Sequence, residues 1–210
     1  MINVVVDLSH HNTVSDFNTI KSAGIAGILH KATQGLSYTD PTYKSRKDQA
    51  LAAGLMWGAY HFGTADDGTS QANYFLSVVN PGPNDLLVLD FEQNYSNGQP
   101  VASMTIAQAE QFVTRVQSVT GRYPGFYSGS YIKQLLGSGT NATLQNCWFW
   151  LAQYGSNAVV PANWPTWTMW QYTDGSAGPD PHSVAGVGNC DRDQFNGPIE
   201  NLRKLWGYEI

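Results

Sequence analysis

The sequence predicts an α/β fold in which one domain forms a mostly parallel barrel. Strand-like and helix-like segments alternate through the first two thirds of the 210 residues, and the expected strands are nearly unbroken apolar runs. Apolar strands joined by helices are typical of a parallel sheet that helices cover. The helical periodicity is lost in the last third, where three more strands follow, enough to complete an eight-stranded barrel.

Turn and capping residues delimit five β/α units. Gly24 and Gly54 end the first two helices, and Asp40 with Pro41 predicts an N-cap followed by proline at the first helical position. The third helix ends before Pro81. The expected strands are residues 4–8, 25–32, 55–62, 86–92 and 123–127, and the helices that follow them are residues 15–23, 41–53, 70–79, 105–120 and 131–136.

The fourth helix and the last third of the chain carry further signals. Thr105 and Gln108 predict a capping box at the start of the long amphipathic helix, and Gly121 ends it. Glycine and proline interrupt residues 155–165 and 174–188, so we expect loops there. The remaining strands are expected at residues 147–153, 166–172 and 190–195, before a final helix over residues 199–206.

The composition indicates a compact protein whose partners are not strongly charged. Apolar residues make up 42% of the chain and charged residues 13%, which argues against a disordered protein. The formal net charge is −5 and the basic residues are scattered along the sequence. The sequence therefore does not predict the basic surface that nucleic-acid binding requires. Seven Trp and eleven Tyr suit either core packing or stacking against sugar rings.

The cysteines and the N-terminus bear on the cellular compartment. Cys147 and Cys190 are too few for a disulfide framework, so we expect two small buried side chains, with a single bridge as the alternative. A strand pattern follows Met1 directly, without a leader, and no apolar run reaches the ~20 residues that span a bilayer. We expect a chain made without a signal peptide and cytoplasmic until released or delivered. Secretion with a leader that this sequence lacks is the alternative.

The ends of the expected strands are unusually polar. Reactive groups of parallel barrels gather where strands end and the following loops begin. Asp90 and Glu92 are the strongest signal, because side chains two apart on a strand face the same way, about 7 Å apart along it. The other polar residues at strand ends are Asp7, Ser9, His10, His30, Lys31, Tyr60, His61, Tyr127, Gln153, Tyr154, Gln171, Tyr172 and Asp191.

Two neighbouring carboxyls suit acid–base chemistry on a glycosidic bond. Repulsion between them keeps one protonated beside an ionised partner, and glycoside hydrolysis needs both a proton donor and a negative charge. A structural role for Asp90 and Glu92, binding Lys31 or capping loops, is the alternative. The histidines lack metal-binding spacing, Ser9 lacks a G-x-S-x-G context, and no phosphate-binding glycine loop is present, so we expect neither a metal nor another cofactor.

Short motifs occur in a fixed order along nearly the whole chain. They are Val6-Asp7-Leu8-Ser9-His10, Lys31-Ala32-Thr33-Gln34-Gly35, Gly58-Ala59-Tyr60-His61-Phe62, Leu89-Asp90-Phe91-Glu92, Trp170-Gln171-Tyr172-Thr173 and Asp191-Arg192-Asp193-Gln194-Phe195. Together they resemble the family 25 glycoside hydrolases, the Chalaropsis-type lysozymes. The resemblance implies a TIM-like barrel of (β/α)5β3 type. It also implies N-acetylmuramidase activity, the hydrolysis of the β-1,4 bond between N-acetylmuramic acid and N-acetylglucosamine in bacterial peptidoglycan.

The resemblance implies roles for individual residues. Glu92 is expected to donate the proton. The other acids expected in the site are Asp7, Asp90 and Asp191. The substrate-binding residues expected at the strand ends are Tyr60, His61, Lys31, Tyr127, Trp170 and Gln171. Two positions depart from the family's common pattern, with Gln34 in place of glutamate and Asp193 in place of asparagine, but neither departure removes a principal acid, so activity is still expected.

Mechanism and substrate leave alternatives open. The resemblance suggests net retention, with either an enzyme carboxylate or the substrate's N-acetyl group as nucleophile, and Asp90 is expected to position or charge that N-acetyl group. A chitinase-like glycosidase on N-acetylated glycans and a non-catalytic glycan-binding protein are the alternative functions. The expected partner is a peptidoglycan glycan strand, bound by a monomer with no membrane association. Residues 1–210 are expected to form one catalytic barrel, as in an endolysin, with no separate cell-wall-binding module.

Overall fold

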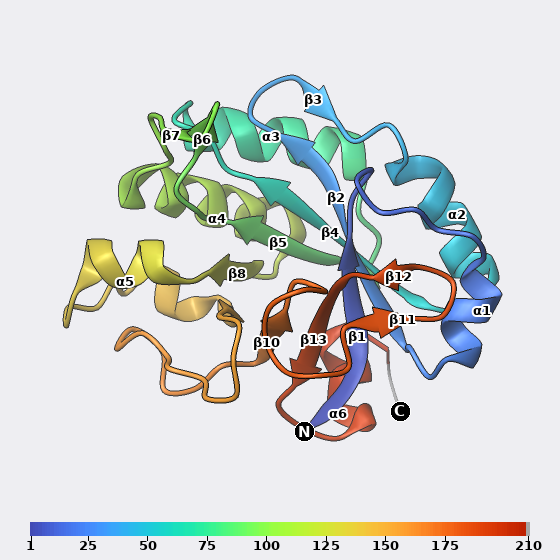
Figure 1. Ribbon diagram of the computed structural model, residues 1–210. Coiled ribbons are helices and arrows are strands. Elements are labelled where there is room, and N and C mark those ends of the chain that lie inside the picture. The colour runs from blue at the N-terminus through green and yellow to red at the C-terminus, as the bar shows by residue number, and fades with distance from the viewer. Residues whose placement is uncertain (209–210) are drawn as a thin grey trace.

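The computed structural model describes residues 1–208 and shows eight strands closed into a barrel (Figure 1). The barrel strands are β1 (Ile2–Leu8), β2 (Gly27–Gln34), β4 (Met56–Phe62), β5 (Leu86–Asp90), β8 (Gly125–Ser128), β9 (Trp148–Ala152), β10 (Met169–Thr173) and β13 (Asp191–Phe195). β1 pairs with β2 on one side and with β13 on the other, and these pairings close the sheet. The predicted α/β barrel is confirmed.

Within residues 1–208, the helices that cover the outside of the barrel follow its first five strands. They are α1 (Phe17–Ser22), α2 (Tyr43–Ala52), α3 (Gly68–Val79), α4 (Ile106–Thr120) and α5 (Ser130–Leu136), and they lie around the outside of the barrel (Figure 1). A single 3₁₀ turn, η1 (Leu144–Asn146), precedes β9, and loops or short strands connect the last three barrel strands. The (β/α)5β3 arrangement is therefore confirmed.

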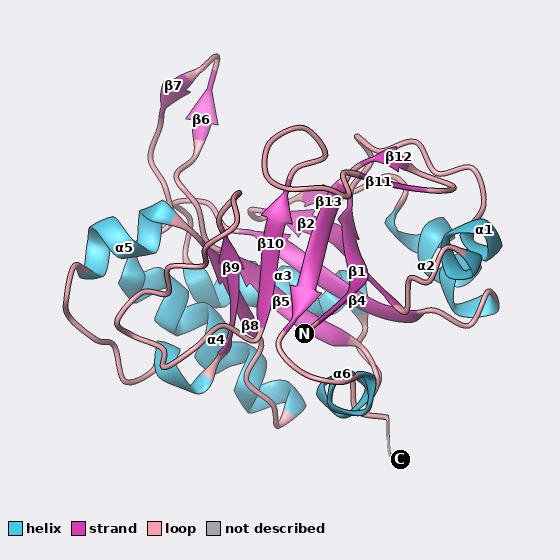
Figure 2. Ribbon diagram, turned by 60° about the horizontal axis from the view of Figure 1, so that its bottom comes forward, coloured by secondary structure: helices cyan, strands magenta, loops and turns pink. Residues whose placement is uncertain are grey.

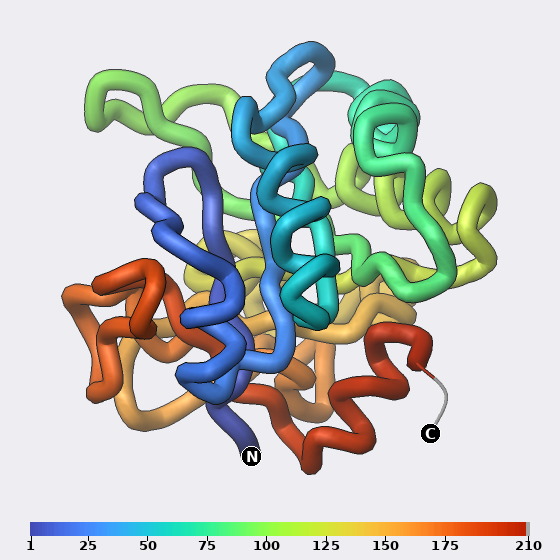
Figure 3. The backbone as a smooth tube through the Cα atoms, turned by 90° about the vertical axis from the view of Figure 1, so that its right-hand side faces the viewer, coloured from blue at the N-terminus to red at the C-terminus, as the bar shows by residue number. Residues whose placement is uncertain are grey.

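The last strand runs against its neighbours. The β1–β2, β2–β4, β4–β5, β5–β8, β8–β9 and β9–β10 pairs are parallel, whereas β13 is antiparallel to both β1 and β10. Figure 3 shows the N-terminal segment, in dark blue, beside the orange-red C-terminal segment. Because β13 is reversed, its first residue lies at the same end of the barrel as the last residues of β1. Asp191 therefore pairs directly with Asp7.

Side-chain alternation divides the apolar residues into two layers. Leu86 and Val88 of β5 belong to a cluster inside the barrel, and Leu87, Leu89 and Phe91 belong to the larger cluster between the barrel and its helices. This division is what the two-residue period of a strand requires. By the same alternation, the next two inward positions after Val88 are those of Asp90 and Glu92.

The final helix closes the end of the barrel opposite those acids. α6 (Ile199–Leu205) brings Leu202 and Trp206 against the interior cluster, and both side chains are fully buried. The Trp206 indole Nε1 donates a hydrogen bond to the Trp57 carbonyl at 2.9 Å. A side chain at Gly27 would meet the Trp206 ring at 3.2 Å, so the absence of one allows the helix to approach this closely. The barrel is therefore open at one end only.

Two predicted boundaries are wrong for physical reasons. Thr42 rather than Asp40 is the N-cap residue of α2, which begins at Tyr43. Asp40 lies two residues earlier; its Oδ1 accepts hydrogen bonds from the Thr42 backbone and hydroxyl, and its Oδ2 accepts one from the His10 backbone and contacts the His10 ring. The fourth barrel strand ends at Asp90 rather than Glu92, because the chain leaves the sheet after the Phe91 amide bonds to β8.

Other local predictions agree with the structure. Thr105 and Gln108 form the predicted capping box, and Gly121 ends α4 with a φ of 75°, which favours glycine. Cys147 and Cys190 are both buried and are not bonded to each other, as the predicted small core residues.

Short antiparallel strands lie in the loops that follow the barrel strands. β3 (Tyr38–Thr39) extends the edge of β2, β6 (Tyr95–Ser96) pairs with β7 (Gln99–Pro100), and β11 (Ser183–Val184) pairs with β12 (Gly188–Asn189). Figure 2 shows the β6–β7 hairpin projecting beyond the body of the molecule, on the side toward which β10 points. Its two-residue turn has positive φ at both Asn97 and Gly98, as twisted hairpins prefer.

We expect Thr105→Ala to destabilise the fold by about 1 kcal/mol, because the substitution removes the side-chain half of the capping box. The Gln108 side chain would keep its hydrogen bonds to the Ala65 carbonyl and to the backbone N–H of residue 105, but the Gln108 backbone N–H would lose its acceptor, the Thr105 hydroxyl. Chemical denaturation measures the free energy of unfolding. Thr114→Ala, on an exposed face of the same helix, is the matched control, and an equal loss in both variants would contradict the capping role.

Candidate active site

A cavity of about 250 Å³ opens at the carboxyl end of the parallel strands. Residues from all eight barrel strands, or from the loops directly after them, form its walls. The lining residues are Asp7, Ser9, His11, Lys31, Tyr60, Phe62, Asp90, Glu92, Tyr127, Trp150, Tyr154, Gln171 and Asp191. All four acids predicted for the site therefore face one cavity.

Each acid reaches the cavity through strand geometry. Asp90 ends β5 and is buried, and Glu92 follows two residues later on the same side, half-exposed at the rim. Asp7 and Asp191 are directly opposed residues of the antiparallel β1–β13 pair. Opposed residues of such a pair have Cα atoms about 4.5–5.5 Å apart, so these two carboxyls are also neighbours.

Burial and repulsion raise the pKa values of all four acids. Burial raises the pKa of Asp90 well above its usual value, Glu92 raises it further, and Lys31 opposes both effects. Burial and the charge of Asp191 likewise raise the pKa of Glu92. For Asp7 the causes are burial and the two acids of β13, and for Asp191, mainly through burial, the pKa rises to about 6. At mildly acidic pH the cavity therefore holds carboxylic acids beside carboxylates.

A chain of hydrogen bonds fixes one side of the cavity. The Tyr127 hydroxyl donates to Gln171 Oε1 at 2.7 Å, and Gln171 Nε2 donates to Asp7 Oδ2 at 2.8 Å. All three side chains are nearly fully buried. The single side-chain amide of Gln171 therefore bonds to both Tyr127 and Asp7, and it fixes the position of Asp7 without a ligand.

Lys31 supplies the cavity with a cation held close to the acids. Its Nζ donates to Gln34 Oε1 at 2.7 Å and lies 4.8 Å from the centre of the Phe62 ring. Burial lowers the pKa of Lys31, while Asp90, Asp40 and Glu92 act in the opposite direction. Gln34 therefore leaves the lysine charge free to act on the acids, where a glutamate would neutralise it.

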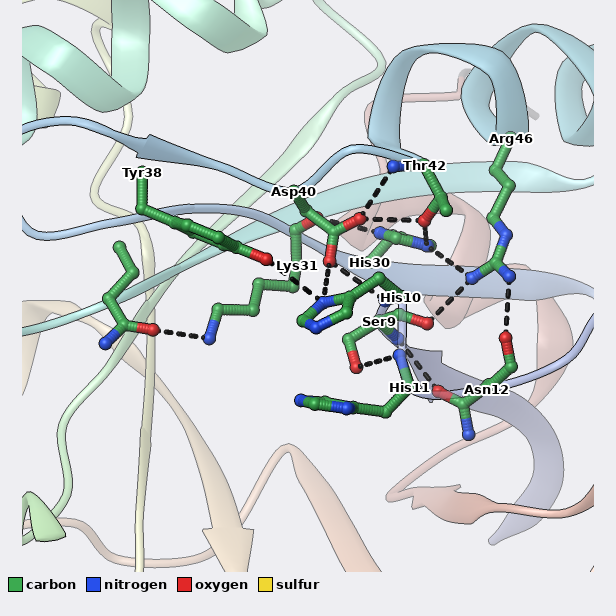
Figure 4. A network of polar contacts seen from close by, with 11 residues as sticks. Ser9, His10, His11, Asn12, His30, Lys31, Tyr38, Asp40, Thr42 and Arg46 are labelled. Carbon is green, nitrogen blue, oxygen red and sulfur yellow. Dashed lines mark hydrogen bonds and ion pairs between the residues drawn. The ribbon is translucent and has the colours of Figure 1, made fainter. Parts of the chain in front are cut away.

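A polar network supports the wall formed by the loop after β1 (Figure 4). Asp40 accepts from the His10 backbone at 2.9 Å and contacts its ring at the same distance, and Arg46 donates to the carbonyls of Ser9 and Asn12. Burial alone would raise the pKa of Asp40, but hydrogen bonds from His10 and Thr42 lower it to about 2. The network fixes the loop that carries Ser9 and His11 into the cavity.

Two predicted substrate-binding residues point the other way. His61 is fully buried outside the barrel, where its ring contacts Thr33 Oγ1 at 2.8 Å and Gln71 Oε1 at 3.1 Å. Trp170 belongs to the outer cluster and donates its indole N–H to the Gln153 carbonyl. Each adjoins a residue that does line the cavity, Tyr60 or Gln171, and adjacent strand residues face opposite sides. The prediction of substrate contact is therefore wrong for both.

The remaining predicted substrate-binding residues, Tyr60, Lys31, Tyr127 and Gln171, all line the cavity. The cavity residues that were not predicted to bind substrate are Ser9, His11, Phe62, Trp150 and Tyr154. Side-chain alternation could have predicted that Phe62 and Trp150 line the cavity, because each occupies an inward position of its strand. His11 and Tyr154 lie in loops, where no periodicity indicates direction.

Within residues 1–208, no group of three or more His, Cys, Asp and Glu side chains has the arrangement of a metal site. In the same part of the chain, none of the helices combines the length and the apolar character needed to cross a membrane.

The site defines a class of enzyme. An open barrel end carries buried acids with raised pKa values, a neighbouring half-exposed acid and a nearby cation, in a cavity lined with tyrosine and tryptophan. One protonated and one ionised carboxyl are what the cleavage of a glycosidic bond requires. The fold and the site together are those of a glycoside hydrolase.

Comparison with known proteins specifies the family. The sequence pattern of the glycosyl hydrolases family 25 matches residues 6–180. The chain is 34% identical over 212 residues to Lysozyme M1 of Streptomyces globisporus, covering 95% of this chain and 70% of that protein. It is 31% identical over 219 residues to the N,O-diacetylmuramidase of Chalaropsis sp., covering 95% and 96%. The chain belongs to glycosyl hydrolases family 25.

A solved structure supports the same assignment. The bacterial lysozyme from Streptomyces coelicolor superposes with a TM-score of 0.84 at 32% identity, over 96% of this chain and 95% of that one.

We expect Asp90→Asn to raise the melting temperature at pH 7 by about 3 °C or more, because it removes a buried, repelled charge. Since the folded pKa of Asp90 is raised, its contribution to stability is full below the unfolded value of about 4 and is lost as pH rises. The gain should therefore be small near pH 4 and grow toward pH 7. Calorimetry across pH measures it, with exposed Asp48→Asn as control; a pH-independent difference would contradict this explanation.

Proposed function

We propose that this enzyme is an N-acetylmuramidase that hydrolyses the β-1,4 bond between N-acetylmuramic acid and N-acetylglucosamine in bacterial peptidoglycan. The observation that carries the proposal is the pair of acids after β5, one buried and one at the rim of a single cavity. The names of the relatives, a lysozyme and an N,O-diacetylmuramidase, support the same bond.

Glu92 is the proton donor in this proposal. Its half-exposed position at the rim allows a leaving oxygen to approach, whereas Asp90 lies deeper. Burial and Asp191 raise the pKa of Glu92, so that it keeps its proton at mildly acidic pH. General acids of this kind contribute about 10²–10⁴-fold to the rate.

Asp90 supports the charge that develops on the sugar. Its Oδ1 atom is buried and accepts no hydrogen bond from any residue in the described range 1–208. An unsatisfied buried oxygen that faces the cavity is free to accept a hydrogen bond from substrate, such as the N–H of an N-acetyl group. This contact would orient the acetamido oxygen toward the anomeric carbon. Asp7 and Asp191 add negative charge on the opposite wall.

The aromatic residues that line the cavity suit a sugar substrate. Tyr60 and Tyr127 both pack edge-on against Trp150, with ring centres 6.5 and 4.6 Å from its ring. The three rings make a rigid, partly apolar wall beside the acids, against which a pyranose can lie. The tyrosines have raised pKa values through burial, so they remain neutral hydrogen-bond donors.

We expect Glu92→Gln to lower the release of reducing ends from purified peptidoglycan by about 10²–10⁴-fold, because glutamine supplies no proton to the leaving oxygen. Mass spectrometry of the fragments identifies the bond by its new reducing sugar, which should be N-acetylmuramic acid. Glu200→Gln, exposed on α6, is the matched control, and unfolding curves check the fold.

Three results would overturn the assignment. Retention of most activity by Glu92→Gln would remove the proton donor. Preferential turnover of chitin oligomers by the unmodified enzyme would identify a chitinase-like glycosidase instead, and binding of peptidoglycan without turnover would identify a glycan-binding protein.

We expect Asp191→Asn to move the alkaline limb of kcat/KM to lower pH by about half a unit or more, because the charge of Asp191 helps to raise the pKa of Glu92. Glu92 is active when protonated, so activity is lost as pH rises through its pKa. The residual activity of the variant, followed across pH, gives the position of the limb. An unmoved limb, or one at higher pH, would show that the two acids do not interact in this way.

A further inference from the structure

A fifth acid, Asp193, lies beneath the cavity without lining it. It is fully buried and shares the inward face of β13 with Asp191, two residues before it. Asp193 pairs with Val5 across β1, whereas Asp191 pairs with Asp7, so Asp193 and Asp7 are diagonal neighbours inside the barrel. Diagonal neighbours of an antiparallel pair are within reach of each other's side chains.

Each oxygen of Asp193 has a different environment. Oδ1 accepts the indole N–H of Trp150 at 2.7 Å. Oδ2 is buried and receives no hydrogen bond from an N–H or hydroxyl donor in the described residues. The Asp7 carboxyl, whose Oδ2 already accepts from Gln171, is the diagonal neighbour within reach of this unpaired oxygen. Two carboxyl groups form a hydrogen bond only when one of them carries a proton.

Within residues 1–208, no lysine or arginine forms an ion pair with Asp7 or Asp193. Arg192 is adjacent in sequence, but its guanidinium donates to the Ser183 carbonyl and to Asn3, away from the interior. The titratable groups whose charge acts on Asp193, or is acted on by it, are Asp7 on β1, Asp191, Arg192 and Cys190 at β13, and Tyr172 on β10. The side chains that face it from β9 and β10, Trp150 and Gln171, are uncharged.

A second buried charge at this point would be unfavourable. Burying an unpaired carboxylate costs several kcal/mol, and a bound proton is the compensation available where no cation is near. Burial and the charge of Asp191 raise the pKa of Asp193 well above its usual value, although Trp150, Asp7 and Arg192 act in the opposite direction. Burial and Asp193 do the same to the pKa of Asp7.

We propose that Asp193 is a positioning residue that shares a single proton with Asp7 and thereby fixes the Asp7 carboxyl at the floor of the cavity. The pair then carries one negative charge rather than two. Asp7 is held by Gln171 on one side and by Asp193 on the other, and Asp193 is held by Trp150. An asparagine in place of Asp193 would offer Trp150 the same acceptor and Asp7 an N–H donor, but it would hold no shared proton.

The shared proton is measured by carbon NMR of the full chain labelled at the aspartate carboxyl carbons. Near pH 6 an ordinary aspartate, with a pKa of about 3.9, is fully ionised. Exposed Asp16, whose pKa is lowered by hydrogen bonds from Thr19 and Asn18, serves as the internal ionised reference. Asp193→Asn and Asp7→Asn identify the two resonances by their loss.

The expected result is that the Asp7 and Asp193 resonances of the unmodified protein together account for one proton at this pH. In Asp193→Asn the Asp7 resonance should move to the fully ionised position. Two resonances as ionised as that of Asp16, or two fully protonated ones, would overturn the proposal. Once the two resonances are identified, the spectrum of the unmodified protein gives this answer, and it does so whether or not peptidoglycan is the substrate.

The positioning role, which rests on the proposed muramidase function, is tested by turnover. Asp193→Ala removes both the acceptor of Trp150 and the partner of Asp7, and we expect kcat to fall about tenfold or more with little change in KM. Asp193→Asn should restore most of the lost kcat at pH 5, since it replaces both hydrogen bonds. Full activity in the alanine variant, or no recovery with asparagine, would overturn the role.

Discussion

The pairing of β1 with β13 is the interaction on which the site depends. β1 is the first strand of the chain and β13 the last, and their antiparallel pairing closes the barrel while placing Asp7 opposite Asp191. Without closure, the acids of β5 would face solvent and their charges would be screened. With closure, carboxyls from opposite parts of the chain share a volume of about 250 Å³ and change one another's proton affinity.

Closure of the barrel also lowers the stability of the fold, because it buries the acids of the site. Acids with raised pKa values bind protons more tightly in the folded chain than in the unfolded chain, so each of them opposes folding as pH rises. The barrel offsets this cost with apolar burial in two layers, inside and outside the sheet, and with α6 sealing the opposite end. The hydrogen bonds from Tyr127 through Gln171 to Asp7 and from Trp150 to Asp193 reduce the cost locally.

Much of the fold and the acid cluster could be predicted because both depend on local periodicity. The order of strands and helices, the capping box at Thr105 and the inward direction of Asp90 all follow from patterns a few residues long. Alternation would also have excluded His61 and Trp170, which adjoin inward residues; resemblance placed them in the site despite that rule.

What the sequence did not reveal depends on tertiary contacts. Asp40 followed by proline has the pattern of a helix cap, but its carboxylate divides its hydrogen bonds between Thr42 beside it and His10 in the loop after β1. The reversal of β13 is set by the loop that precedes it, which has no helical or strand period over most of its length. His11 and Tyr154 reach the cavity from loops for the same reason.

The position of α6 has a practical consequence. β1 begins at Ile2, directly after Met1, and α6 packs beneath the barrel, so both ends of the described chain lie at the face opposite the cavity (Figure 2). Attachment to a solid support or to another polypeptide through either end would leave the mouth of the barrel facing outward. The architecture thus separates the point of attachment from the point of contact with an extended polymer.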